Sequence, residues 1–100
     1  MNTDELIKAV QDWSIARGLD NASSTAQTVK LMEEVGELAR AVLNGDRDGI
    51  IDSIGDATVV LIILAQQNEL QFSACLNAAW DQIKNRTGKT QNGVFIKDKK

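Results

Sequence analysis

Residues 57–65 read ATVVLIILA, and this most apolar run of the chain decides the fold. A membrane span needs roughly 20 such residues, so a run this short belongs in a protein core. The β-branched residues within 58–64 leave a strand as the alternative, but the length of the segment and the lack of internal turn residues favour a helix. We expect a helix over about 47–67 that is almost wholly apolar from 57 to 65 and is the central, most buried element of the fold.

The segments on either side of this run repeat apolar residues at helical spacing. These apolar sets are Leu6, Val10 and Trp13; Leu31, Val35, Leu38 and Val42; and Phe72, Cys75, Leu76, Ala79 and Ile83. Thr3 and Ser24 are the expected N-terminal caps of the first two helices. The chain has no proline, which would break helix interiors. The sequence therefore predicts an all-α fold with helices at about 3–17, 24–43, 47–67 and 71–86, followed by an irregular tail over 88–100.

One hundred residues predict a single domain, 1–100, with room for one core. The short apolar patch Val94-Phe95-Ile96 is expected to pack back on the helices. Four short helices cannot fully cover the nearly all-apolar one. We therefore expect each chain to fold as a subunit of the four-helix-bundle type, and we expect these subunits to associate as a homodimer or a tetramer.

Composition excludes several classes of function. With no histidine and a single cysteine, the chain cannot build a Ser-His-Asp triad, a Cys-His dyad or a cysteine-based zinc site. The net charge of −3 argues against binding to duplex nucleic acid, and no run is long enough for a membrane span. The acidic, non-apolar start shows no signal peptide, so the expected location is the cytoplasm.

Five acids fall on the two helices predicted at 24–43 and 47–67: Glu33, Glu34, Glu37, Asp52 and Asp56. Like charges at i,i+4 spacing destabilise a helix, and a short connection between the two helices lets these acids face each other. Helical geometry places Glu34 and Glu37 beside the core edge and Glu33 on the far face. The alternative is that these acids are ordinary solvated surface groups. Oxygen ligands without histidine or cysteine select a hard cation such as Mg²⁺.

The order of these motifs resembles a known family. The segment at 30–39 reads KLMEEVGELA, the segment at 52–56 reads DSIGD, and the segments NRTGK at 85–89 and NGVFIK at 92–97 follow. Together with Trp13 and Arg17-Gly18 they resemble the MazG family of all-α nucleoside triphosphate pyrophosphohydrolases, in particular its short phage and mobile-element members. The likeness extends over most of the chain.

The resemblance implies Mg²⁺-dependent hydrolysis of (deoxy)nucleoside triphosphates to monophosphate and pyrophosphate, with Mn²⁺ as an alternative ion, within oligomers. It implies Glu34, Glu37 and Asp56 as metal ligands, and Glu33 as a ligand or as the group that orients the attacking water. The family's second motif ends at Asp56 and normally has an acid where this chain has Ser53. Asp52 is the expected substitute.

The expected catalytic acids are therefore Glu33 and Glu37. Candidates for contacts to the nucleotide are Lys30, Lys84, Arg86, Lys89 and Trp13. For the cations the alternative is solvated surface charge, and for Trp13 it is packing in the core. For the whole chain the alternative is a non-catalytic regulatory or binding module that retained the fold, which the serine favours.

Overall fold

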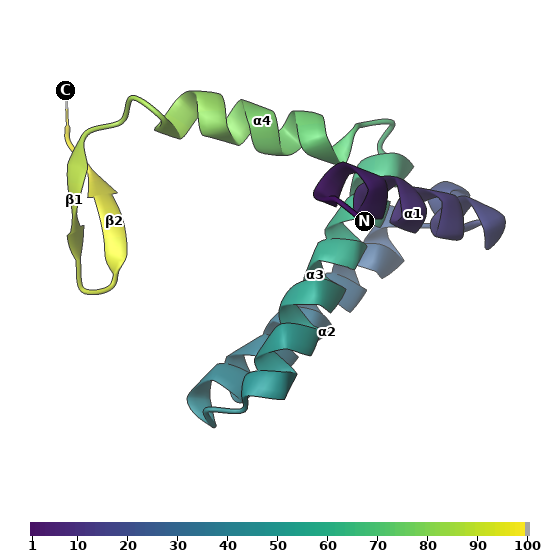
Figure 1. Ribbon diagram of the computed structural model, residues 1–100, viewed down its shortest axis with the longest axis horizontal. Helices are drawn as coiled ribbons and strands as arrows, with labels where there is room; N and C mark the ends of the chain where they lie inside the picture. The colour runs from purple at the N-terminus through teal and green to yellow at the C-terminus, as the bar shows by residue number, and fades with distance from the viewer. Residues whose placement is uncertain (100) are drawn as a thin grey trace.

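The computed structural model describes residues 1–99. Its elements, in chain order, are α1 (Thr3–Ala16), the short 3-10 helix η1 (Leu19–Asn21), α2 (Ser24–Leu43), α3 (Arg47–Gln67), α4 (Phe72–Ile83), β1 (Gly88–Gln91) and β2 (Val94–Lys97). Helices dominate the chain (Figure 1), which confirms the all-α prediction. No helix of the described part is long and apolar enough to cross a membrane.

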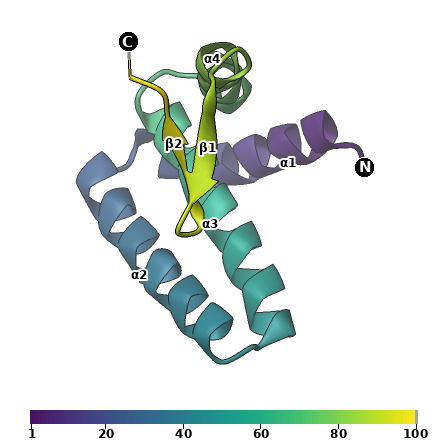
Figure 2. The ribbon, with the colours of Figure 1, turned by 90° about the vertical axis from the view of Figure 1, so that its left-hand side faces the viewer.

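Helices α2 and α3 form an antiparallel helical hairpin, and they contact each other more extensively than any other pair of elements. The two helices lie side by side along most of their length (Figure 2). Their tight connection depends on Gly45, which adopts a left-handed φ of 63°, and on Asp46, whose side chain accepts a hydrogen bond from the Gly49 amide at 3.0 Å. The hairpin fixes which residues of α2 face which residues of α3.

Helix α3 supplies most of the core, as the apolar run predicted, and no strand forms in it. The buried residues on α3 are Ser53, Val60, Ile62, Ile63 and Ala65. The predicted apolar stripe of α2 is half wrong, because Leu31 and Leu38 are half-buried while Val35 and Val42 are exposed. Glu34 and Ala41 take the buried places instead. The face of α2 against α3 is therefore rotated toward the acidic residues.

Helix α1 crosses the C-terminal part of α3, and side-chain amides of α3 hold α1 and the following η1 there. Gln66 donates from Nε2 to the carbonyl of Gln11 at 3.2 Å, and Gln67 donates to the carbonyl of Leu19 at 2.9 Å. The predicted caps Thr3 and Ser24 were each placed one residue late. Asn2 caps α1 through a capping box with Glu5, and Ser23 caps α2.

Helix α4 leaves the body of the molecule and carries β1 and β2 at its far end (Figure 1). We call this part, residues 72–97, the arm. The strands pair antiparallel through an Asn92-Gly93 turn in which both residues have positive φ. The prediction of an irregular tail over 88–100 was therefore wrong for 88–97, and α4 ends at Ile83 rather than near 86. Residue 100, the end of that predicted tail, lies outside the described residues.

The arm contradicts two expectations about burial. No residue of α4 is buried, and the large side chains Leu76, Trp80 and Ile83 are all exposed. The patch Val94-Phe95-Ile96 is exposed as well, so it does not pack back on the helices. Within one chain, the four helices therefore do not close into a bundle: the helical hairpin and α1 form the packed body, and the arm projects from it.

Candidate metal centre

An acidic cavity opens on one side of the helical hairpin, near its turn. Glu37 from α2 and Asp52 and Asp56 from α3 line this space of about 260 Å³. Asp52 and Asp56 are one turn apart on α3, and Glu37 reaches the same space from α2 because the two helices run antiparallel. Three of the five predicted acids thus share one cavity.

Glu34 lies one turn before Glu37 and is buried between the helices, with 4% of its surface exposed. One carboxylate oxygen, Oε1, lies 3.3 Å from the Nζ atom of Lys30. The other, Oε2, is buried and has no hydrogen-bond partner. A buried carboxylate oxygen that accepts no hydrogen bond lowers the stability of the fold. This oxygen can therefore still accept a hydrogen bond or bind a cation.

Lys30 lies close to two acids, the buried Glu34 and the exposed Glu33. Its Nζ atom also lies 3.5 Å from a carboxylate oxygen of Glu33, whose side chain is largely exposed. The pKa of Lys30 is raised, mainly by its hydrogen bond to Glu34 and then by the charges of Glu34 and Glu33. Glu33 thus points to solvent, as the helical geometry predicted, and it does not line the acidic cavity.

Ser53 occupies the position where the resemblance leads one to expect an acid. Its side chain is buried against α2 and lines the acidic cavity beside Asp52 and Asp56. Asp52 faces the cavity from one residue earlier, so a carboxylate is present there although the motif position is a serine. The hydroxyl is shorter than the missing carboxylate and carries no charge.

The donor set fits a hard divalent cation in chemistry. All candidate ligands are carboxylate oxygens, three of them line one cavity, and Glu34 Oε2 is a buried acceptor without a partner. Within residues 1–99, however, no three acidic or cysteine side chains lie close enough together to hold an ion as they stand. The side chains would have to draw together around a cation.

The predicted nucleotide contacts do not gather in one place. Only Lys30 lies among the acids. Trp13 is on α1, where its ring is exposed rather than in the core and the guanidinium carbon of Arg17 lies 4.1 Å from the ring centroid. The other three cations, Lys84, Arg86 and Lys89, all lie on the arm. The Nζ atom of Lys84 lies 3.1 Å from a carboxylate oxygen of Asp81.

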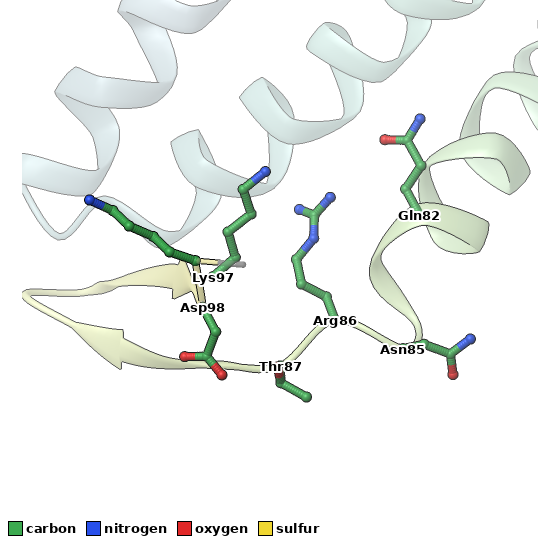
Figure 3. Close-up of a pocket in the computed structure, with 7 residues that line it drawn as sticks. Gln82, Asn85, Arg86, Thr87, Lys97 and Asp98 are labelled. Carbon is green, nitrogen blue, oxygen red and sulfur yellow. The ribbon is translucent and has the colours of Figure 1, made fainter.

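A basic cavity of about 850 Å³ lies where α4 meets the strands (Figure 3). Arg86 and Gln82 line it from the end of α4 and its connection, and Lys97 lines it from β2. Of the predicted contacts, only Arg86 is part of it. Figure 1 shows the arm well apart from the turn of the helical hairpin, so the acidic and basic cavities are separate in a single chain.

Some residues around the two cavities were missed by reasoning from the sequence. Arg40, Asn44 and Asp46 line the acidic cavity. Arg40 follows Glu37 by three residues and could have been found from that spacing. Asn44 reads only as a helix-ending signal, and Asp46 reads as a helix-capping residue. Lys97 could not be assigned, because the tail was not predicted to fold back as a β-hairpin.

Comparisons with known proteins identify the family. Residues 22–91 match the sequence profile of the MazG nucleotide pyrophosphohydrolase domain, a range that includes the acids of α2 and α3. The chain is 45% identical over 67 residues to an uncharacterized 18.2 kDa protein in the rep-hol intergenic region of Haemophilus phage HP1. That alignment includes 66% of this chain but only 41% of the phage protein. No solved structure matches the chain.

Proposed function

The chain belongs to the MazG nucleotide pyrophosphohydrolase domain family, and on this premise we propose that it hydrolyses nucleoside or deoxynucleoside triphosphates to the monophosphate and pyrophosphate. The observation that carries the proposal is the arrangement of Glu37, Asp52 and Asp56 around one cavity beside the buried Glu34. These residues lie within the segment that matches the family. A role in removing non-standard or excess nucleotides would fit this reaction.

In the proposed site, Glu34, Glu37, Asp52 and Asp56 hold the divalent cation, Mg²⁺ or Mn²⁺. The unpartnered Oε2 of Glu34 and the oxygen-only donor set support this assignment. Such an ion supplies charge neutralisation at the phosphate oxygens and a more acidic bound water. The exposed Glu33 serves as a ligand or orients water only if it turns inward, so it is the weakest member of the proposed set.

The remaining steps belong to side chains of the protein. Glu37 is the proposed base, because it lines the acidic cavity and a histidine is not available to accept the proton. Lys30 sits beside the acids with a raised pKa, so it stays protonated and can contact phosphate. Arg86, Lys84 and Lys89 are proposed phosphate contacts, and Trp13 a proposed stacking surface for the base.

The separation of the acidic and basic cavities indicates which partner the proposed function requires. A triphosphate bound at the acids of one chain cannot meet Arg86 of the same arm in the arrangement of Figure 1. We therefore include self-association, as a dimer or a tetramer, in the proposed function. The proposed setting is the cytoplasm, where nucleoside triphosphates are found and where the free thiol of Cys75 stays reduced.

The test is pyrophosphate release from a panel of ribo- and deoxyribonucleoside triphosphates, with Mg²⁺ or Mn²⁺, by the wild type and by Glu37→Gln. We expect turnover of at least one nucleotide by the wild type and its loss in the variant. Pyrophosphate release that persists unchanged in Glu37→Gln would remove that residue from the mechanism.

The second candidate function is a non-catalytic binding module, favoured by the buried Ser53 in place of an acid. The variant Ser53→Glu separates the two. If the serine has weakened an enzyme, the added carboxylate raises pyrophosphate release at high Mg²⁺ concentration. If wild type and Ser53→Glu both release none from any nucleotide, the binding-module alternative stands.

A further inference from the structure

The acidic cavity has two ends, one among the acids and one at the turn of the helical hairpin. Glu37, Asp52 and Asp56 line the first end. Arg40 and Asn44 line the turn end from α2, because they follow Glu37 on the same side of the helix. Among residues 1–99, Arg40 is the only cation that lines this cavity. A positive group therefore stands beside the proposed metal ligands within one chain.

Arg40 differs from Lys30, the cation on the other side of these acids along α2. The Nζ atom of Lys30 lies 3.3 Å from Glu34 and 3.5 Å from Glu33, so its charge is already paired. Arg40 forms no ion pair with any carboxylate in the described part of the chain. The planar fork of N–H donors in a guanidinium group matches two oxygens of a phosphate. Arg40 is therefore free to bind an anion in the cavity.

The turn end of the cavity is kept open by a glycine. Gly49 lines this end from α3, and a Cβ atom there would meet the side chains of Asp46 and Ala41. Asp46 is the acid of this end, and its Oδ1 atom accepts a hydrogen bond from the Gly49 amide at 3.0 Å. The missing side chain at position 49 therefore preserves both the cap of α3 and the open space at the turn end.

An apolar pocket lies on the same side of α3, farther from the turn. Val59 follows Asp52 by two helical turns with a net rotation of about 20°, so the two side chains point the same way about 10 Å apart along the helix. Val59 lines a pocket of about 370 Å³ together with Trp13 and other apolar residues of α1. A nucleotide with its base against Trp13, as proposed above, and its phosphates at the acids therefore directs its terminal phosphates toward Arg40.

We infer that Arg40 binds the β- and γ-phosphates of a nucleoside triphosphate, the two phosphates that leave as pyrophosphate. This role rests on the hydrolytic function proposed above. It supplies, from the same chain, a phosphate contact that the arm cannot provide in the arrangement of Figure 1. It also gives the site a preference for substrates with a full triphosphate, because a monophosphate bound at the acids does not extend to Arg40.

Binding of ligands that do not react tests this role without requiring hydrolysis. Calorimetric titration in Mg²⁺ uses three probes: inorganic pyrophosphate, a deoxynucleoside triphosphate with a methylene group between its α- and β-phosphates, and the matching monophosphate. Arg40→Gln should weaken binding of the first two by at least about tenfold, as expected for lost hydrogen bonds to charged groups. It should weaken binding of the monophosphate by less than about twofold. Arg40→Lys, which keeps the charge and loses the fork, should give intermediate losses.

The matched control is Arg47→Gln, which removes the same exposed group from the start of α3, outside the cavity. All three affinities should stay within about twofold in this variant. Binding of Mg²⁺ alone is a further readout. Removing a positive charge from beside the acids should tighten it by at least about twofold in Arg40→Gln. A weaker affinity for Mg²⁺ in Arg40→Gln would show that Arg40 maintains the cavity itself and would overturn the inference.

Three other results would also overturn it. They are equal losses in Arg40→Gln and Arg47→Gln, an equal loss for the monophosphate and the triphosphate analogue, and a wild type that binds neither pyrophosphate nor the analogue. Hydrolysis is decided separately. A wild type that binds pyrophosphate through Arg40 but hydrolyses no nucleotide keeps this role and removes the enzyme. Turnover that is unchanged in Arg40→Gln keeps the enzyme and removes this role.

Discussion

The helical hairpin and the arm are both built from amphipathic helices, yet they differ in what covers them. In the hairpin, α2 and α3 bury residues against each other and the side of the pair with the acids forms a cavity. In the arm, α4 has an equally regular apolar stripe and buries nothing. The difference shows that a helical apolar pattern indicates the presence of a partner surface without saying where that surface is.

The largest expected difference between the two parts concerns activity. Asp56→Asn removes a carboxylate from the acidic cavity and should lower kcat/KM for the best nucleotide by about 1,000-fold, equivalent to about 4 kcal/mol. Asp81→Asn makes the same change in the arm, where the acid is exposed and pairs only with Lys84, and should leave the activity within about twofold. Equal losses in the two variants would break the assignment of chemistry to the hairpin.

The next difference concerns stability. Ile63→Ala truncates a core residue of α3 that is 3% exposed and should lower the free energy of unfolding by about 3 kcal/mol. Ile83→Ala makes the identical change on α4 and should cost less than about 1 kcal/mol in dilute protein. Urea unfolding at two protein concentrations sharpens the comparison. The cost of Ile83→Ala should grow with concentration if the arm is covered by a second copy, and that of Ile63→Ala should not.

Metal binding should stabilise the protein through the hairpin and not through the arm, by a slightly smaller free energy than the one expected for Ile63→Ala. At a hundred times its Kd, Mg²⁺ or Mn²⁺ should stabilise the wild type by about 2.7 kcal/mol, measured as a rise in Tm. Glu34→Gln removes the charge of the buried carboxylate, whose Oε2 has no hydrogen-bond partner, and replaces one of its oxygens with an amide nitrogen, so it should abolish most of that rise. Asp81→Asn on the arm should keep it. A rise that survives in Glu34→Gln would show that the ion binds without this residue.

The smallest expected effect concerns two lysines. Lys30→Met leaves the buried Glu34 without its cation and should lower Tm, whereas Lys84→Met breaks only an exposed pair and should change Tm less. Because folding raises the pKa of Lys30 through its hydrogen bond to Glu34, its contribution is present below the ordinary lysine pKa and is lost as pH rises through the raised value. The difference in Tm between wild type and Lys30→Met should therefore persist at neutral pH and vanish in strong alkali.

Much of the hairpin could be predicted from the sequence. The run at 57–65 identified the central helix, and the spacing of the acids placed Glu33 outward and Glu37 beside Asp56. The burial of Glu34 could not be predicted, because an apolar stripe through Val35 and Val42 fits the pattern equally well. Which of two adjacent stripes faces α3 depends on how the two helices dock, and the sequence of one helix does not contain that information.

The arm was predicted less well for a related reason. Its apolar residues, Phe72 to Ile83, were assigned to the core of one chain because apolar periodicity is normally satisfied within a domain. The strands were missed because they are short and exposed, and only Asn92-Gly93 signals the turn that pairs them. Because that pairing was not predicted, the sequence did not indicate that Lys97 and Arg86 line the same cavity.

The two sides of the helical hairpin have a consequence for which changes in chain length the protein can tolerate. A single residue inserted within α2 between Glu34 and Glu37 would rotate everything after it by about 100° and would turn Glu37 out of the cavity. An insertion in α3 between Ser53 and Asp56 would turn Asp56 out of the cavity in the same way. Within the helical hairpin, insertions should be accepted only at the turn around Gly45, where no helical rotation is propagated. Related sequences should therefore vary in length at this turn and keep constant spacing within both helices.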